Sequence, residues 1–239
     1  MRHLRRIFAL LVPVALVASH LGAAHAGPSP DASSSAAPAP AGPADEIAKK
    51  VQDFYNQTKT FQAQFSQVYK VKAYNQTKKS KGRVVFEKPG KMSWTYDNNG
   101  NRVVSDGKLL KVYEKENSQM FEQPVEKSQY PAALSFLMGQ GELVKSFNLK
   151  QLDSATMKFE GGYVLEGTPK DATPAYQKVI FYVDRETSQV RRVIILDAQG
   201  NRNEFTFTSP TVNKDLPSGS FDFTPPEGTN IVKPGDEKK

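Results

Sequence analysis

Apolar and polar residues alternate along most of the chain that follows residue 60. This period of two is typical of antiparallel β-strands that have one buried and one exposed face. The pattern therefore predicts a mainly β protein. The clearest alternating runs place the following residues on apolar faces: Phe61, Ala63, Phe65, Tyr69 and Val71; Met92, Trp94 and Tyr96; Phe159, Tyr163 and Leu165; Phe205 and Phe207.

Short turn signals separate these runs. Pairs that contain Gly or Asn favour tight turns between antiparallel strands. Counting the runs between them predicts about eleven strands, and the chain has neither a βαβ rhythm nor an internal repeat. A single antiparallel sheet, strongly curved or partly closed, is the expected architecture. The turn pairs are Asn99-Gly100, Asp106-Gly107, Gly161-Gly162 and Gly200-Asn201.

Two segments interrupt the β pattern with helical spacing. Residues 45–58 carry one apolar stripe, with Asp45 as the expected N-cap, and predict a helix. Residues 131–139 run from a proline to a glycine around an apolar centre, and residues 142–145 could add another helical turn. We expect this second helix to lie across the concave side of the sheet, where its apolar residues would be buried. Those residues are Ala132, Ala133, Leu134, Phe136, Leu137 and Met138.

The N-terminal segment differs in composition from the rest of the chain. Residues 1–26 have a basic start, an apolar run of 11 residues and a final Ala24-His25-Ala26, which predicts a secretory signal peptide cleaved after Ala26. Residues 27–44, rich in Pro, Ala and Ser, are expected to form a flexible linker. The folded domain is then expected over residues 45–234, with a polar tail at 235–239.

Cysteine and histidine usage excludes several kinds of chemistry. The chain has no cysteine, and its three histidines, His3, His20 and His25, all lie in the predicted signal peptide. Nucleophilic sites built on His or Cys and zinc sites built on the same residues are therefore not expected. The remaining carboxylates lie at turns or on polar faces, so we predict no enzymatic activity, no metal site and no cofactor.

The formal net charge of +7 falls to +4 (7 − 3) once the three arginines of the predicted signal peptide are removed. The lysines are scattered, and an exported protein is not expected to bind nucleic acid. A modest positive charge favours approach to anionic membrane surfaces. The alternative is that these lysines simply keep a β-rich surface soluble.

Four stretches, in this order, resemble the outer-membrane lipoprotein carrier family, LolA. The resemblance extends over nearly all of residues 45–234. No single stretch is specific to this family, whereas the four stretches in this order are. The stretches are Phe61-Gln-Ala-Gln-Phe65-Ser-Gln67 after the N-terminal helix, Gly82-Arg-Val-Val-Phe-Glu-Lys88-Pro89 followed by Trp94, Val104-Ser-Asp-Gly-Lys108 followed by Tyr113, and Phe221-Asp-Phe-Thr-Pro-Pro-Glu-Gly228.

The resemblance implies an unclosed β-barrel with a helical lid over an apolar cavity. It also implies a periplasmic monomer that takes acylated lipoproteins from an inner-membrane ABC-type releasing complex and passes them to an outer-membrane lipoprotein receptor. Phe65, Tyr69, Met92, Trp94 and Tyr113 on strands, and Leu134, Phe136, Leu137 and Met138 on the lid, would line the cavity. Ordinary core packing is the alternative for each of them.

Lys88 stands where the family typically has an arginine, directly before the proline at position 89. The family's arginine is understood to hold the lid closed through hydrogen bonds to lid carbonyls. Lysine keeps the positive charge and three donors but loses the planar guanidinium group. The resemblance thus implies that Lys88 is a lid latch.

Three other functions compete with the lipoprotein carrier. A binding or sensing protein for another periplasmic lipid or amphiphile could use the same fold. An enzyme would depend on the remaining carboxylates or on a Ser-Lys pair. A structural or adhesive protein would be expected to have long repeats or exposed apolar edges, and the sequence has neither.

Overall fold

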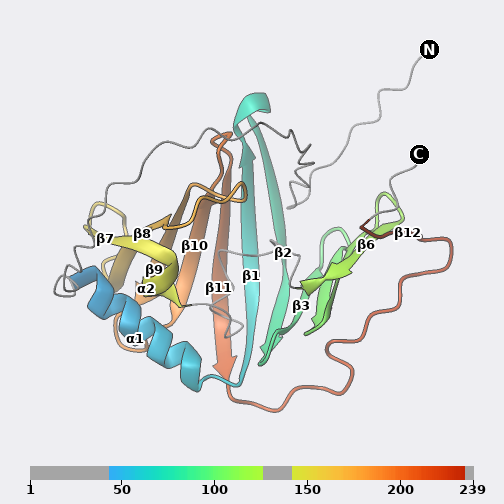
Figure 1. The fold of residues 1–239 in the computed structure, drawn as a ribbon, viewed down its shortest axis with the longest axis horizontal. Coiled ribbons are helices and arrows are strands. Elements are labelled where there is room, and N and C mark those ends of the chain that lie inside the picture. The colour runs from blue at the N-terminus through green and yellow to red at the C-terminus, as the bar shows by residue number, and fades with distance from the viewer. Residues whose placement is uncertain (1–42, 126–141, 235–239) are drawn as a thin grey trace, which may run out of the picture.

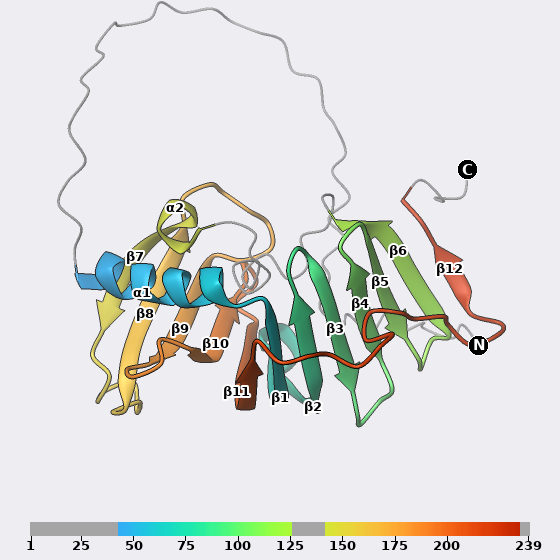
Figure 2. The same ribbon diagram turned by 90° about the horizontal axis from the view of Figure 1, so that it is seen from below.

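A computed structural model describes residues 43–125 and 142–234 of the chain. The described residues form one large, curved sheet with a single long helix across it (Figures 1 and 2). The sheet has twelve strands in the order β12-β6-β5-β4-β3-β2-β1-β11-β10-β9-β8-β7, and its two edge strands, β12 and β7, do not pair with each other. The predicted unclosed, mainly β architecture is therefore confirmed.

The helices are α1 (Pro43–Gln57) and α2 (Leu143–Ser146), with a 3₁₀ turn η1 (Lys72–Tyr74). The central strands are β1 (Thr60–Val71), β2 (Gln76–Glu87), β3 (Lys91–Tyr96) and β11 (Arg202–Val212). On one side follow β4 (Arg102–Asp106), β5 (Leu109–Glu114), β6 (Gln119–Pro124) and β12 (Asn230–Val232). On the other side lie β7 (Phe147–Leu152), β8 (Gly162–Pro169), β9 (Lys178–Asp184) and β10 (Val190–Leu196).

The strand count exceeds the expected number by one, and β12 explains the difference. It has three residues and pairs in parallel with β6, with Ile231 opposite Met120. All the other pairs in the sheet are antiparallel. Three residues are too few for alternation to be recognised, and this pairing joins segments about one hundred residues apart in the sequence.

The face of the sheet that carries α1 is called the concave face here, and it holds the main core. Strand register places every second residue of each strand on this face. The apolar side of α1 packs onto the same core through Ile47, Ala48, Val51 and Tyr55, all of them buried. Burying a side chain the size of valine contributes about 1.5 kcal/mol or more, so α1 is held mainly by its contacts with the sheet.

Helix α1 begins two residues earlier than expected, at Pro43, which suits the first helical position because proline has no N–H to leave unpaired. Asp45, predicted as the N-cap, instead lies inside the first turn, where its charge still interacts favourably with the helix dipole. The helical turn expected near residues 142–145 is present as α2. The helix predicted at 131–139 lies outside the described residues.

Segment 213–229 leads from β11 to β12 and covers part of the opposite, convex face (Figure 2). Its Phe223 ring packs on Tyr113 at a centroid distance of 5.4 Å and on the Arg102 guanidinium at 5.2 Å. Lys111 Nζ donates to the Phe223 carbonyl at 3.0 Å. The convex face of the sheet is therefore covered in its β3–β6 half.

Candidate functional site

Aromatic side chains gather at the centre of the concave face. The indole ring of Trp94 lies 4.9 Å from Phe65, 5.9 Å from Phe86 and 5.4 Å from Phe205, measured between ring centroids. These four residues come from β3, β1, β2 and β11, so the cluster joins the middle of the sheet. All four are at most 2% exposed.

Three of the predicted lining residues, Phe65, Met92 and Trp94, lie within this concave core. They follow from alternation, because Trp94 pairs with Val84 and Met92 with Phe86 in the antiparallel register of β2 and β3. The indole Nε1 of Trp94 is buried and has no hydrogen-bond partner among the described residues. This N–H donor is the one polar side-chain atom of the four residues in the cluster.

Tyr69 lies on the same face as Phe65, four residues further along β1, but is only half-buried. Burial raises the pKa of its phenol, and the nearby Asp197 carboxylate raises it further. Tyr69 thus lies between the apolar centre of the concave face and the polar end of that face near the β1–β2 turn.

Tyr113 does not belong to the concave face, which corrects the prediction made for it. On β5, Leu110 and Val112 point into the concave core, so Tyr113 points to the other side of the sheet. There it is buried against Phe223 of the C-terminal segment. Tyr113 belongs to the packing of the convex face and is removed from the candidate lipid-lining set.

The four predicted lid residues, Leu134, Phe136, Leu137 and Met138, lie outside the described residues. Their assignment remains a prediction from the sequence.

Lys88 connects the β2–β3 turn to the end of α1. Its Nζ donates a hydrogen bond to the backbone carbonyl of Tyr55, in the last turn of the helix. The same carbonyl accepts a hydrogen bond from Thr58 N at 3.1 Å. Because the last carbonyls of a helix carry a partial negative charge, an ammonium group is a suitable second partner there. Burial lowers the pKa of Lys88. The resemblance had suggested a lid carbonyl as the acceptor, and in the structure the acceptor belongs to α1.

Tyr55 also ties the helix to the far half of the sheet. Its hydroxyl accepts a hydrogen bond from the backbone N–H of Val190, the first residue of β10, at 3.2 Å. Burial raises the pKa of this phenol well above its ordinary value. One residue of α1 is therefore joined to β10 through its side chain and to Lys88 through its carbonyl.

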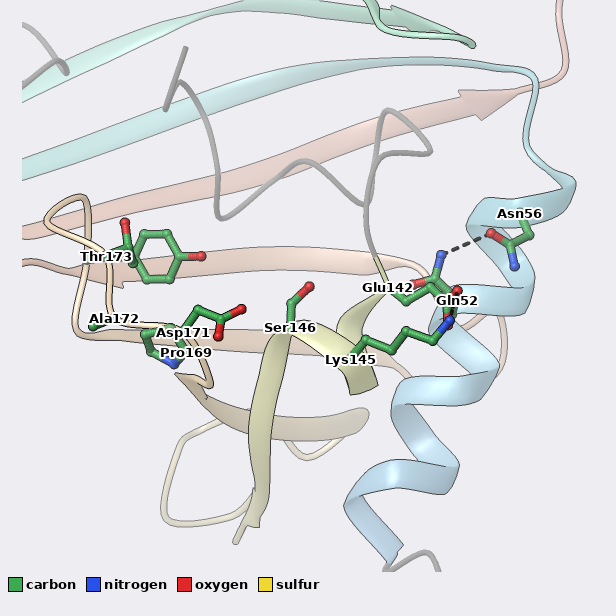
Figure 3. A pocket seen from close by; sticks show the side chains of 10 residues that line it. Gln52, Asn56, Glu142, Lys145, Ser146, Pro169, Asp171, Ala172 and Thr173 are labelled. Atoms are coloured by element: carbon green, nitrogen blue, oxygen red, sulfur yellow. Dashed lines mark hydrogen bonds and ion pairs between the residues drawn. The ribbon is translucent and has the colours of Figure 1, made fainter. Parts of the chain in front are cut away.

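A hollow of about 660 Å³ lies between α1, α2 and the loop after β8 (Figure 3). Gln52 Nε2 donates to Asn56 Oδ1 at 2.9 Å, and Leu143 N donates to Gln52 Oε1 at 3.1 Å. Lys145 and Glu142 form an ion pair at 2.8 Å on its rim. Amide and charged groups line this pocket, so it does not suit hydrocarbon. The lining residues are Gln52, Asn56, Glu142, Lys145, Ser146, Pro169, Asp171, Ala172, Thr173 and Tyr176.

Within the described ranges, no group of three or more His, Cys, Asp or Glu side chains is placed to hold a metal ion. In those same ranges no helix has the length and apolarity needed to cross a membrane.

Comparison with known proteins shows the family to which this chain belongs. The family model described as "Outer membrane lipoprotein carrier protein LolA" matches residues 56–224, which is well over half of the sequence. The chain belongs to the LolA family. The matched range contains Lys88 and the four residues of the aromatic cluster, whereas α1 up to Tyr55 lies before it.

Two relatives named outer-membrane lipoprotein carrier protein show how far the similarity extends. The protein from Nitrosomonas europaea is 28% identical over 186 residues, covering 77% of this chain and 88% of the relative. The protein from Dechloromonas aromatica is 27% identical over 184 residues, covering 77% and 86%. Among solved structures, the LolA superfamily protein NE2245 from Nitrosomonas europaea matches with a TM-score of 0.43 and 16% identity, covering 77% of this chain and 99% of that one.

The predicted lining set of this LolA-family chain left out several members of the concave core. Phe86, Phe205 and Phe207 all point to the same side as Trp94. Alternation placed Phe205 and Phe207 on an apolar face without assigning them to the lining, and it could have identified Phe86, which is two residues from Val84. Val51 and Tyr55 of α1 were expected to be buried, but the sheet strands they would meet could not be known from local spacing.

Proposed function

We propose that this protein is a periplasmic carrier that binds the acyl chains of lipoproteins on the concave face of its sheet. The observation that carries the proposal is the aromatic cluster around Trp94 in a sheet that does not close, in a chain that belongs to the LolA family. A relative's name, outer-membrane lipoprotein carrier protein, supports the choice of cargo.

The energetics of an acyl chain require such a carrier. Each methylene taken out of water contributes about 0.8 kcal/mol, so exposing a chain of roughly fifteen methylenes would cost on the order of 12 kcal/mol. A lipoprotein cannot cross an aqueous compartment at that cost. A carrier must cover the chain and must also release it without fuel, so its affinity has to lie below that of the next acceptor.

The concave face meets both requirements if α1 can move. With α1 in place, Tyr55 lies 6.5 Å from Phe61 of β1, and the apolar side of the helix packs on the concave core. Displacing α1 would open a way to the rings around Trp94 and to the Met92 thioether, a flexible side chain that adapts to differently shaped guests. In this proposal the contacts that Lys88 and Val190 make with Tyr55 hold the closed state, and acyl chains replace α1 contacts in the open state.

The proposal includes specific partners. The donor would be an inner-membrane ABC-type lipoprotein-releasing complex and the acceptor an outer-membrane lipoprotein receptor. The predicted signal peptide, cleaved after Ala26, would bring the chain to the compartment between them. No catalytic step is needed, since transfer proceeds down an affinity gradient.

Mass spectrometry of the protein isolated from a periplasm, after incubation with inner-membrane vesicles that contain lipoprotein, tests this function. We expect an acylated protein or peptide bound to the carrier. A bound free glycolipid would instead favour the alternative, a binding or sensing protein for another amphiphile. Absence of any bound acyl chain would refute both functions.

The predicted lid has a separate test in Leu137→Glu, with Gln140→Glu as the control that adds the same charge nearby. We expect the first variant to fold but to refuse cargo, and the second to load normally. If the Leu137→Glu variant still loads cargo, residues 131–139 do not form a lid over the bound acyl chains. For Lys88→Leu we expect loading with slowed delivery, and normal transfer kinetics would remove Lys88 from the release step.

A further inference from the structure

The β1–β2 hairpin is strongly basic. Between Lys59 and Phe86 the sequence contains no Asp or Glu. Four basic side chains in its outer part, beyond Gly82, are exposed, and so is Arg83 next to that point; the four are Lys70, Lys72, Lys79 and Lys81.

None of these five side chains forms an ion pair with another residue of the described ranges. Few acidic groups lie beside the hairpin. Glu204 pairs with Arg202 at 2.5 Å, Asp197 accepts hydrogen bonds from Asn201 at 2.8 Å, and the backbone N–H of Asp97 bonds the Lys81 carbonyl. Asp97 and Asp197 are fewer than the exposed cations, so the outer part of the hairpin keeps a net positive charge.

The hairpin projects beyond its neighbour β3 (Figure 1). The last pair between β2 and β3 joins Gly82 and Tyr96. Toward the hairpin turn, β2 extends beyond this pair as far as Gln76. The 3₁₀ turn η1 closes the hairpin, and Tyr74 at its tip is 75% exposed. Tyr74 is one of two large apolar side chains that are exposed among the described residues.

The tip is held in place rather than left as a loose loop. Lys72 N donates to Asn201 Oδ1 at 2.9 Å, and Asn98 bonds both Lys81 N and the Lys79 carbonyl. The backbone is therefore fixed from both sides, while the lysine side chains remain in solvent.

Lysines on an exposed strand edge also prevent edge-to-edge pairing between molecules. That role accounts for Lys79 and Lys81, which follow the unpaired edge of β2. It does not account for Lys70, on a strand paired on both sides, or for an exposed tyrosine at the tip, which would promote association. An aromatic ring with a polar end, surrounded by cations, suits a membrane–water interface, where tyrosines are enriched.

We propose that the outer part of the β1–β2 hairpin is a docking arm for the anionic headgroups of a lipid bilayer, with Tyr74 entering the interface. Lys88 and the end of α1 lie at the opposite end of β2, about 30 Å away at ~3.3 Å per residue. Docking therefore orients the molecule with the hairpin toward the bilayer, and with Lys88 and the end of α1 away from it. This surface goes beyond the proposed carrier function and does not depend on it.

Vesicle flotation of the protein isolated from a periplasm tests the docking arm. The vesicles contain phosphatidylcholine alone or phosphatidylcholine with 30% phosphatidylglycerol, about the anionic content needed for a clear surface potential. We expect binding to the anionic vesicles only, and a decline as salt is raised because headgroup attraction is screened. A lysine near an anionic surface contributes about fivefold to partitioning, so Lys72→Gln, Lys79→Gln and Lys81→Gln together should lower it about 100-fold.

The matched control replaces three exposed lysines elsewhere, Lys108, Lys150 and Lys158, by glutamine. It has the same net charge as the hairpin variant and should lose less than fivefold. Tyr74→Trp adds an exposed indole whose emission should shift to shorter wavelength on anionic vesicles, while buried Trp94 gives a constant background. Equal losses in both triple variants, an unshifted Tyr74→Trp emission, or no binding of the unaltered protein would each overturn the proposal.

Discussion

In the proposed carrier mechanism, the hydrogen bond from Lys88 to α1 controls the opening of the concave face. Its donor is an ammonium group and its acceptor is the carbonyl of Tyr55 in the last helical turn. A hydrogen bond to a charged group contributes about 1.5–3 kcal/mol net. Because Lys88 is only half-buried, the lower end of that range applies, and this value already includes the attraction of the ammonium group to the helix dipole.

Lys88→Leu should therefore make opening of α1 easier by about 1.5–2 kcal/mol. Since 1.4 kcal/mol corresponds to a factor of ten, the population of the displaced helix should rise about 10- to 30-fold. Hydrogen exchange followed by mass spectrometry measures this directly. Amides of residues 43–57 should exchange 10- to 30-fold faster, while those of β1 and β11 should change less than twofold.

Two further variants make the test specific. Lys91→Leu removes a neighbouring lysine that pairs with Glu87 at 2.9 Å on the surface, and it should leave α1 exchange within twofold of the original. Lys88→Arg keeps a cation with several donors and should restore slow exchange. Unchanged exchange in Lys88→Leu, or equal acceleration in α1 and the sheet, would show that this bond does not hold the helix.

Three other changes have expected outcomes. Tyr55→Phe leaves the buried N–H of Val190 unpaired and should lower the free energy of unfolding by about 1–3 kcal/mol at pH 7, measured in urea. Burial raises the pKa of Tyr55 in the folded state, so the stability that Tyr55 contributes is complete below its unfolded pKa of 10.0 and declines as the pH rises above that value. The difference in unfolding free energy between the original protein and Tyr55→Phe should therefore shrink above pH 10. A difference that stays constant would contradict this. A Cβ at Gly82 would lie 1.8 Å from the Thr95 carbonyl oxygen, so Gly82→Ala should destabilise by about 2–3 kcal/mol, and a urea midpoint within error of the original would refute the packing argument. Phe223→Ala removes ring packing on the convex face and should destabilise by about 1 kcal/mol without altering cargo loading; loss of loading would mean that this face takes part in binding.

Alternation predicted the parts of the fold that local spacing controls. Phe65, Met92 and Trp94 share a face because residues two apart in a strand point the same way, and the register of β1, β2 and β3 then brings them together. The unclosed, mainly β sheet followed from many such runs separated by turn signals. Helix α1 followed from its apolar stripe, with its start displaced by two residues.

Contacts between distant segments could not be predicted in this way. Tyr113 was assigned from its spacing after a turn, but its neighbour on the convex face, Phe223, is about 110 residues further along the chain. The same holds for β12, whose pairing with β6 depends on the path of segment 213–229. The family resemblance indicated Lys88 as a donor to a backbone carbonyl, whereas the identity of the carbonyl that it reaches depends on how α1 lies across the sheet.

Trp94 allows the central claim to be tested directly, because it is the chain's single tryptophan and lies in the middle of the concave cluster. The measurement is quenching of its fluorescence by a lipopeptide whose acyl chains carry bromine, with the unbrominated lipopeptide as the reference. Brominated chains should quench Trp94 as they bind, and the unbrominated lipopeptide should compete for the same site. Binding of the brominated lipopeptide without quenching would place the acyl chains away from the concave face and would contradict the proposed carrier mechanism.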